Sequence, residues 1–411
     1  MTDPVKPDVR RVVLAYSGGL DTSVAVRWMV EEWGAEVVAV AVDVGQGASD
    51  TEVLRERALA AGAVEAVVVD ARAEYATEFI APAIRANALY EGKYPLLSAL
   101  SRPVIARHLV KAAREFGADA VAHGCTGKGN DQIRFEVGLR TLAPDLEVLA
   151  PVRVWGFTRD DSMDYADTYD IPVTSTREKP YSIDANLVGR AIECGALEDP
   201  WAAPPEGIFE LVGDVADAPR EPTDVIVGFE EGVPVSLDAQ KLPLHEMLPA
   251  LDTIVGRYGW GRLDMVENRR VGIKARETYE CPGALALLLA HADLESVTVE
   301  RDLAREKARL EPRWADLVYD GHWYSPLREA LDAFIDVSQR HVSGEVRLRL
   351  ETGRCFVSGR RADRGLYDHD LATYDATDSF RHEDAAGFVR LWGLSLETWS
   401  RRLGPGSEEG P

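Results

Sequence analysis

The chain has 411 residues, of which 46% are hydrophobic and 28% are charged. This composition is typical of a globular protein, and the length suffices for about two or three domains. The formal net charge is -23, so most of the surface repels polyanions and a nucleic-acid partner is disfavoured.

The cysteines and the N-terminus indicate the cellular compartment in which we expect the protein. Cys125, Cys194, Cys281 and Cys355 are far apart and form no metal-ligand pattern. The start of the chain is polar and contains Pro4 and Pro7, unlike a signal or transit peptide. No apolar run approaches the roughly 18 residues that a membrane span needs. We therefore expect a soluble, cytoplasmic protein with reduced thiols and no membrane partner.

From residue 12 onward, short β-branched runs alternate with longer helical patterns. The runs that predict strands are 12–16, 36–42, 64–70, 119–122 and 147–150. The patterns that predict helices are 22–33, 51–61, 74–88 and 103–116. Such alternation is typical of a parallel sheet covered by helices. We predict a doubly wound α/β domain over 1–175, in which the loops after Tyr16, Val42 and Ala122 face one ligand-binding crevice.

Near 171–180 the alternation stops, and an α+β domain is expected over 176–380. Segments 225–229 and 233–237 predict one hairpin, and 344–359 predicts another. Helical patterns cover 243–258, 301–309 and 326–341. A last region, 381–411, contains a predicted helix over 383–403 with an apolar stripe that includes Leu391, Trp392 and Trp399. Packing within its own domain and packing on a neighbouring subunit both remain open.

The first chemistry-bearing motif joins the first predicted strand to the first helix. It consists of Ser17, Gly18, Gly19, Leu20, Asp21, Thr22 and Ser23. Consecutive glycines allow positive φ and close approach of an anion, while the helix start supplies free N–H groups and a favourable dipole. A simple capped turn would need only one hydroxyl and one glycine. The motif therefore predicts a phosphate-binding loop.

The second motif, from His123 to Asp131, also lies between a strand and a helix. It is not a Walker A motif, because Ala122 occupies the place of the first glycine and Gly129 the place of the serine or threonine. It is not a dinucleotide fingerprint either, because Gln132 replaces the last glycine. A glycine-rich, polar helix start opposite the first loop suits polar substrates held against a nucleotide.

The first motif fits the SGGxD[ST] loop of N-type ATP pyrophosphatases, which cleave ATP between the α- and β-phosphates. Together with HGCTGKGNDQIRFE at 123–136 and the segments ALYEGKYPL, YSIDANL, VENRRVGIKARETYE and LVYDGHWYSP, it resembles the argininosuccinate synthase family. The resemblance runs in order from about Val12 to Phe388.

This resemblance implies a carbon-nitrogen ligase of arginine biosynthesis. Such an enzyme condenses L-citrulline with L-aspartate through citrullyl-adenylate, releases AMP and pyrophosphate, uses Mg²⁺ and forms a homotetramer. No protein nucleophile is required, and no Ser-His-Asp or Cys-His arrangement stands out in the sequence. Asp21 is a candidate for organising the magnesium ion, or it caps the loop.

The resemblance also implies binding residues. Those implied for ATP are Ala15, Tyr16, Ser17, Gly18, Gly19, Leu20, Asp21, Thr22, Ser23, Val42, through its backbone, and Gly124. Those implied for aspartate are Thr126, Asn130 and Asp131. Those implied for citrulline are Tyr94, Asn130, Arg134, Ser182, Glu267 and Tyr279. Ala99 and Ala191 stand where many relatives have a citrulline-contacting serine.

The charges of these residues suit two zwitterions, because Asn130 and Arg134 can hold carboxylates while Asp131 and Glu267 can hold ammonium groups. From the residues alone, a surface salt bridge for Arg134 and a solvated acid for Glu267 are the more common roles. Two other functions remain as alternatives. A tRNA thiolase is disfavoured by the net charge and the absence of paired cysteines in the sequence, and a nucleotide sensor would not need the second motif.

Overall fold

The computed structural model describes residues 6–47, 51–173, 181–375 and 377–404. The chain divides into two compact units, Met1–Arg364 and Gly365–Pro411, and each is described by itself. Within the described residues, no helix combines the length and the apolar composition that crossing a bilayer would need. The predicted boundary between 175 and 176 lies outside the described residues, and the divisions at 175 and 380 stay predictions.

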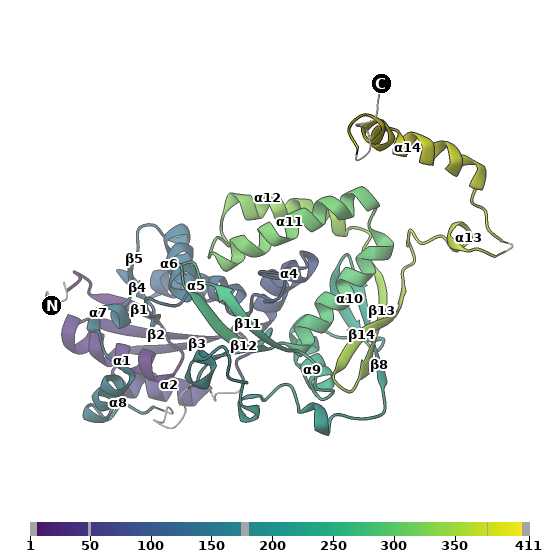
Figure 1. Cartoon of the computed structure of the whole chain (residues 1–411). Helices are drawn as coiled ribbons and strands as arrows, with labels where there is room; N and C mark the ends of the chain where they lie inside the picture. The colour runs from purple at the N-terminus through teal and green to yellow at the C-terminus, as the bar shows by residue number, and fades with distance from the viewer. Residues whose placement is uncertain (1–5, 48–50, 174–180, 376, 405–411) are drawn as a thin grey trace. The chain divides into compact units, whose positions relative to one another are not determined.

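The N-terminal part of the larger unit is built on a parallel sheet. Its described strands are β1 (Arg11–Ala15), β2 (Glu36–Asp43), β3 (Glu65–Asp70), β4 (Ala120–Ala122) and β5 (Glu147–Leu149). Their order is β3-β2-β1-β4-β5, and every neighbouring pair is parallel. The chain winds from β1 out to β3 and then returns to the other side of β1, which places a topological switch point between β1 and β4. The predicted doubly wound α/β domain is confirmed (Figure 1).

Helices cover both faces of this sheet. Alternate residues of a strand face opposite sides. Accordingly, Val12 and Leu14 of β1 are buried in one core with α1 (Leu20–Trp28), α2 (Thr51–Ala60) and α8 (Arg159–Thr168). Val13 is buried in a second core with α5 (Leu97–Glu115). Burial on both faces explains why these strands are almost continuously apolar in the sequence.

The helices of this part confirm the predicted elements, with one clear correction at a boundary. The remaining helical segments are the π-helix Met29–Trp33, α3 (Arg72–Tyr75), the π-helix Ala76–Ile80, α4 (Ala81–Arg85), α6 (Asp131–Leu142) and α7 (Pro151–Trp155). Helix α5 begins at Leu97 rather than at the predicted Pro103. Proline is common at a helix start, but here the buried Leu97 and Leu100 extend the helix towards its N-terminus.

The second part of the larger unit contains two antiparallel sheets. One has the order β11-β12-β7-β6 and consists of β6 (Ser182–Asn186), β7 (Gly189–Glu193), β11 (Arg262–Asn268) and β12 (Lys274–Glu280). The other has the order β10-β9-β8-β13-β14 and consists of β8 (Thr223–Glu230), β9 (Val233–Leu237), β10 (Gln240–Lys241), β13 (Gly344–Glu351) and β14 (Arg354–Arg361). Both predicted hairpins, β8–β9 and β13–β14, are confirmed.

This part also contains four long helices, of which the first two pack on the sheets and the last two pack on each other. They are α9 (Leu244–Gly256), α10 (Pro282–Thr298), α11 (Arg301–Tyr319) and α12 (Pro326–Gln339). The prediction missed α10, because this helix is buried on most sides and therefore lacks the one-sided apolar pattern of a surface helix. The predicted end of α11 at Arg309 is also wrong, since the helix continues through Pro312 to the buried Tyr319. Its last residues contribute to the candidate site.

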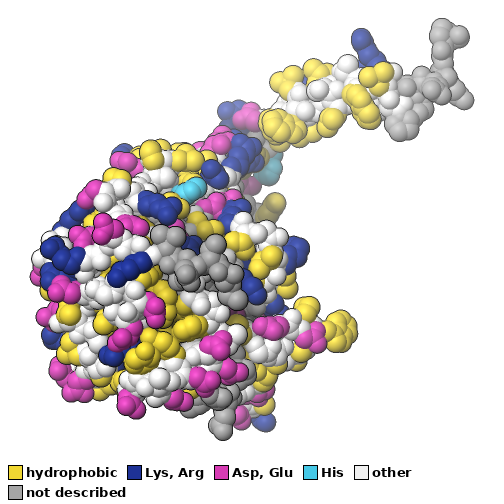
Figure 2. Space-filling view, turned by 90° about the vertical axis from the view of Figure 1, so that its left-hand side faces the viewer, with side chains coloured by type: hydrophobic (Ala, Val, Ile, Leu, Met, Phe, Trp, Pro, Cys, Tyr) yellow, Lys and Arg dark blue, Asp and Glu magenta, His cyan; other side chains and the backbone are white. Residues whose placement is uncertain are grey.

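The smaller unit contains the predicted C-terminal helix. Helix α14 (His382–Leu403) follows the short α13 (His369–Ala372). None of the described residues of α14 is buried within this chain. The side chains of Leu391, Trp392 and Trp399 are 71%, 78% and 54% exposed, and Figure 2 shows hydrophobic side chains along this helix. An exposed apolar surface on a helix is typical of a protein–protein contact.

Candidate functional site

The two glycine-rich loops meet at the switch point of the parallel sheet. They follow β1 and β4, which pair side by side in parallel, so both loops leave the same edge. Gly124, in the second loop, lies so close to the first that a Cβ atom there would stand 2.9 Å from Cγ2 of Thr22. Glycine at this position therefore allows the two loops to approach each other.

The first loop is held in an anion-binding conformation by its own hydroxyl groups. Gly18 has a φ of +74°, in the left-handed region that favours glycine. The Oγ of Ser17 lies 3.1 Å from Oγ1 of Thr22 and accepts a hydrogen bond from the amide of Gly19 (3.3 Å). No side chain caps the start of α1, so its first N–H groups remain available to an anion.

The other residues predicted to bind ATP lie around this loop. Tyr16 and Ser23 are buried and their hydroxyl oxygens lie 3.1 Å apart, so this contact joins the two ends of the loop. Val42 is buried in β2, and its carbonyl accepts a hydrogen bond from Nε2 of Gln46 (3.0 Å). Leu20 is buried and Ala15 is half-buried.

A cavity of about 360 Å³ opens beside the two loops. Its wall is formed by both loops, α5, α6 and the β6, β7, β11 and β12 strands. The predicted site residues that line it are Ser17, Asp21, Tyr94, Gly124, Thr126, Asn130, Asp131, Arg134, Ser182, Glu267 and Tyr279. The structure thus brings together every residue predicted for the two amino acids, although they come from segments up to 185 residues apart. The side chain of Ala191 also lines the cavity, whereas Ala99 is fully buried in α5.

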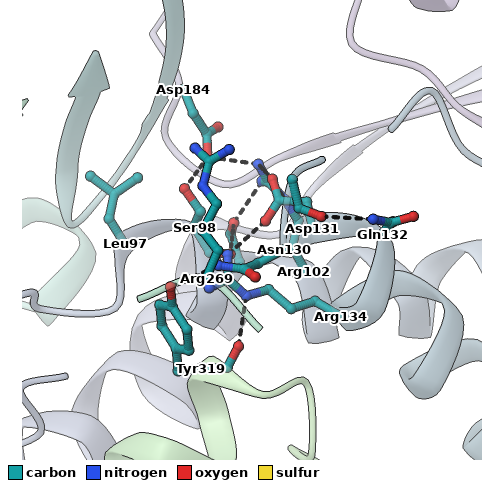
Figure 3. Close-up of polar contacts among 12 residues, drawn as sticks. Leu97, Ser98, Arg102, Asn130, Asp131, Gln132, Arg134, Asp184, Arg269 and Tyr319 are labelled. Carbon is teal, nitrogen blue, oxygen red and sulfur yellow. Dashed lines mark hydrogen bonds and ion pairs between the residues drawn. The ribbon is translucent and has the colours of Figure 1, made fainter. Parts of the chain in front are cut away.

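Two guanidinium groups converge on Asp131 at the start of α6 (Figure 3). Its Oδ2 accepts a hydrogen bond from Nη2 of Arg102 (2.7 Å), and its Oδ1 accepts one from Nη1 of Arg134 (2.7 Å). Nη2 of Arg102 also donates a hydrogen bond to Oδ2 of Asp184 (2.6 Å). The hydroxyl of Ser98 donates to the same oxygen. Burial would raise the pKa of Asp131, but the two guanidinium groups outweigh it and hold the pKa well below its usual range. Asp131 is therefore ionised at neutral pH.

Hydrogen bonds from α11 and the β11–β12 turn hold the side chains of Asn130 and Arg134 in place. Nδ2 of Asn130 donates to the hydroxyl of Tyr319 (2.7 Å), and its Oδ1 accepts from the amide of Arg270 (3.0 Å). Nε of Arg134 donates to the carbonyl of Tyr319 (3.1 Å). Because Arg134 is only 5% exposed, the alternative role of a surface salt bridge is wrong.

An acidic cluster lies at the other side of the cavity. Glu267 is 3% exposed, which also contradicts the alternative of a solvated acid. Arg269 donates to Glu277 (2.8 Å) and Glu193 (2.5 Å), and its Nε lies 3.7 Å from Glu267. Burial, reinforced by the neighbouring Glu277, raises the pKa of Glu267 to about 8. Three carboxyl groups share one guanidinium, so this side of the cavity favours an additional cation.

Two aromatic rings complete the wall. The rings of Tyr94 and Tyr279 stack with centroids 4.6 Å apart. The Tyr94 hydroxyl accepts a hydrogen bond from the amide of Ser98 (2.8 Å), and the Tyr279 hydroxyl donates to Glu277 (2.9 Å). Both rings are thereby fixed beside the acidic cluster.

Two family models match nearly the whole chain. The arginosuccinate synthase N-terminal HUP domain matches residues 11–172, and the arginosuccinate synthase C-terminal domain matches residues 181–399. The chain belongs to the argininosuccinate synthase family. The family resemblance expected from the two loops is confirmed, and the parallel sheet described above is the HUP domain of this argininosuccinate synthase family member.

A solved structure also shows similarity to this chain. It is the U34-tRNA thiolase NcsA from Methanococcus maripaludis with its [4Fe-4S] cluster. The match has 17% sequence identity and a TM-score of 0.27, and it covers 43% of this chain and 63% of that chain, less than two thirds of its length. A likeness at this level carries no argument about the fold or the activity of the argininosuccinate synthase family member.

Several side chains of the cavity were not predicted. They are Ser98, Arg102, Asp184, Glu193, Arg269 and Glu277. Arg269 and Glu277 lie within VENRRVGIKARETYE, one of the segments on which the resemblance to argininosuccinate synthases rested. Asp184 lies within YSIDANL, another of these segments, whereas Arg102 carries no local signal, because it meets Asp184 only when α5 and β6 fold against each other.

The cavity of this family member offers little to a metal ion on its own. Among the described residues, no group of three or more histidine, cysteine, aspartate or glutamate side chains could hold a metal. Asp21 lines the cavity next to the first loop, and desolvation by the surrounding protein raises the pKa of its carboxyl although Arg159 opposes the shift. A single carboxylate suits Mg²⁺ only where substrate phosphates supply further ligands.

Proposed function

We propose that this chain is an ATP-dependent ligase that condenses L-citrulline with L-aspartate and releases AMP and pyrophosphate. The observation that carries the proposal is the convergence of two glycine-rich loops on one cavity with separate cationic and acidic sides. A phosphate-binding loop alone would serve many enzymes. The second loop and the clusters around Asp131 and Glu267 offer charged and polar groups that can bind two amino-acid zwitterions beside the nucleotide.

In this proposal, ATP lies on the first loop. Its phosphates accept hydrogen bonds from the N–H groups at the start of α1 and from the hydroxyls of Ser17 and Thr22. Asp21 is the residue that would help to hold Mg²⁺ together with phosphate oxygens of the substrate, and the bound ion would supply positive charge to the departing pyrophosphate. Val42 takes part through its backbone near the end of β2, and the lack of a side chain at Gly124 lets the second loop lie close to the first beside the nucleotide.

The two amino acids occupy the cavity. Thr126, Asn130 and Asp131 hold aspartate. The residues proposed for citrulline are Tyr94, Asn130, Arg134, Ser182, Glu267 and Tyr279. The acidic cluster around Glu267 suits the citrulline ammonium group, whereas spare donors of Arg134 and Asn130 suit carboxylates. Ala191 offers no hydroxyl to the cavity, and Ala99 lies buried away from it.

The proposed chemistry needs no protein nucleophile. The ureido oxygen of citrulline attacks the α-phosphorus and expels pyrophosphate, and the amino group of aspartate then displaces AMP from citrullyl-adenylate. Cys125 also lines the cavity, but burial and the nearby Asp131 raise the pKa of its thiol, so the nucleophilic thiolate is not populated at neutral pH. The protein's contribution is positioning and charge neutralisation.

A homotetramer in the cytoplasm, without nucleic-acid or membrane partners, completes the proposal. The exposed apolar side chains of α14 support packing on neighbouring subunits. All four cysteines are free, which suits a reducing compartment. Acidic and basic side chains are interspersed on the face drawn in Figure 2, and the net charge is -23, so the surface gives nucleic acid little to bind.

A pyrophosphate-release assay tests this function. We expect pyrophosphate and AMP from ATP, Mg²⁺, citrulline and aspartate, no argininosuccinate when either amino acid is omitted, and no AMP when citrulline is omitted. A nucleotide sensor would release no pyrophosphate under any of these conditions. A tRNA thiolase would require tRNA and a sulfur donor, and release that depends on these would overturn the proposal.

A further inference from the structure

A second cavity lies at the other end of the β6–β7 hairpin. Its volume is about 550 Å³, within the range of small-molecule sites. The wall comes from residues 45–47 after β2, the β6–β7 hairpin, the segment around Leu211 and one face of α9. Among the described residues, the two cavities share no lining side chain, and the ligase function proposed above uses none of the residues in this second wall.

One carboxyl group in this wall is buried without a counter-charge. The side chain of Asp252, on α9, is 9% exposed. Its Oδ1 accepts a hydrogen bond from the amide of Gly283 (2.8 Å), while Oδ2 has no hydrogen-bond or ion-pair partner within the part of the chain that the structure describes. Burial raises the pKa of Asp252 to about 7; the Gly283 amide opposes this shift and Glu280 adds to it. A buried carboxylate of this kind is costly unless a cation neutralises it.

The buried arginine in the same wall does not supply that cation. Nη1 of Arg190 pairs with Oε2 of Glu280 at 2.5 Å, and its Nη2 pairs with Oε1 of Glu210 at 3.0 Å. The charge of Arg190 is thus already balanced by two carboxylates. Asp252 remains the group of this cavity that a ligand cation would satisfy.

A free cation lies in the exposed part of the wall. Arg257 is exposed at the end of α9. Its guanidinium has no hydrogen-bond or ion-pair partner among the residues described. Apolar groups, including Leu187 and Pro249, also line the cavity. The cavity therefore combines an unneutralised acid in its depth, an apolar surface, and an unpaired guanidinium near the solvent.

We infer that this cavity is a second amino-acid site, which takes an elongated amino acid with a cationic end. The terminal ammonium group lies on Oδ2 of Asp252, the methylene stem contacts Leu187 and Pro249, and the α-carboxylate pairs with Arg257. A simple anion would leave Asp252 unneutralised and be repelled by it, and an apolar molecule would leave both charges unsatisfied. The inference goes beyond the ligase reaction and does not depend on it.

Calorimetric titration of the full-length protein with L-lysine tests the site. Because lysine could also enter the catalytic cavity, the titration is made without ATP and with citrulline and aspartate at saturation. A separate citrulline titration shows whether that cavity is filled, so failure of the proposed ligase function is seen independently. Norleucine lacks the side-chain ammonium group of lysine, and cadaverine lacks its carboxylate. The variants are Asp252→Asn, Arg257→Gln and, as a control on an exposed part of α9 outside the cavity, Glu246→Gln.

We expect one lysine bound per chain, with norleucine and cadaverine each at least about tenfold weaker, as the loss of one charge-assisted interaction predicts. Asp252→Asn should weaken lysine but not norleucine, and Glu246→Gln should bind lysine normally. Absence of lysine binding, or equal affinity for lysine and norleucine, would overturn the inference. If Asp252→Asn does not fold, two tests of the site remain. One is the comparison of lysine, norleucine and cadaverine on the unaltered protein, and the other is the Arg257→Gln variant.

Discussion

Nη1 of Arg153, on α7, donates a hydrogen bond across 2.8 Å to Oε1 of Gln132, at the beginning of α6. The amide nitrogen of Gln132 in turn donates to the carbonyls of Gly127 (2.6 Å) and Gly129 (3.1 Å). Arg153 therefore fixes the orientation of the amide that closes the second glycine-rich loop. It touches no proposed ligand contact itself, so it acts as a positioning residue.

Replacing Arg153 with methionine should loosen this loop. Loss of a charge-assisted hydrogen bond corresponds to about tenfold or more in affinity, and we expect the KM for aspartate to rise by about that factor while the KM for ATP changes little. The matched control is Arg140→Met, since Arg140 also pairs with Glu136 but makes no hydrogen bond to Gln132. Steady-state kinetics with each substrate varied in turn measure the KM for aspartate and for ATP. Equal effects of the two substitutions would refute a special role for Arg153.

Gly18→Val should abolish ATP binding without unfolding the protein. Valine resists the φ of +74°, and its Cβ would stand 2.5 Å from Cδ2 of Leu54, so the loop must shift away from its anion-binding conformation. Gly117→Val is the control, because Gly117 also has a positive φ (+60°) but has open space around it and lies at the far end of α5. Circular dichroism checks the fold and calorimetry measures ATP. Similar ATP affinity in both variants would remove the first loop from the nucleotide site.

The two loops could be predicted because each carries its signal within a few consecutive residues. Gly18 and Gly124 follow strands, and the neighbouring hydroxyls need no distant partner to reveal their chemistry. Arg102 and Tyr319 could not be predicted in the same way, since Arg102 gains its role from Asp131 and Asp184, and Tyr319 gains its role from Asn130, only in the folded chain. The buried α10 was missed for a related reason, because its pattern depends on neighbours on all sides.

Glu267 should make the ligand-free protein less stable as the pH rises. Its pKa is about 8 in the folded protein and about 4.3 in an unfolded chain. Between these pH values the folded state binds more protons than the unfolded state, so the free energy of unfolding decreases with increasing pH. The side chain of the Glu267→Gln variant cannot titrate. The free energy of unfolding of this variant should therefore fall less with increasing pH.

Urea unfolding at pH 5 and pH 8 measures this effect. We expect the stability of Glu267→Gln, relative to the unaltered protein, to improve from pH 5 to pH 8. Glu246→Gln, an exposed acid on α9, should show a smaller change. A relative stability of Glu267→Gln that stays constant or falls over this range would show that Glu267 is not held in its neutral form in the folded protein.

Removing the chain after Glu383 should lower the oligomeric state. This deletion takes away Leu391, Trp392 and Trp399, whose side chains are more than half exposed. Deletion after Gly404 is the control, because it leaves α14 intact. Light scattering gives the mass per particle of each protein. An unchanged mass after the longer deletion would show that α14 does not hold subunits together.

The last prediction concerns the bond that forms first. Citrulline labelled with heavy oxygen in its ureido group should transfer the label to the phosphate of AMP, because the ureido oxygen attacks the α-phosphorus and stays on it when aspartate displaces the adenylate. The cavity supports this route, since its thiol is held protonated and its charged side chains suit substrate zwitterions rather than a covalent intermediate. Mass spectrometry of the AMP detects the label. Unlabelled AMP would mean that water captured the α-phosphate, and labelled free phosphate with ADP would mean attack at the γ-phosphate. Either result would show that the amino-acid cavity and the phosphate loop do not converge on the same phosphorus atom.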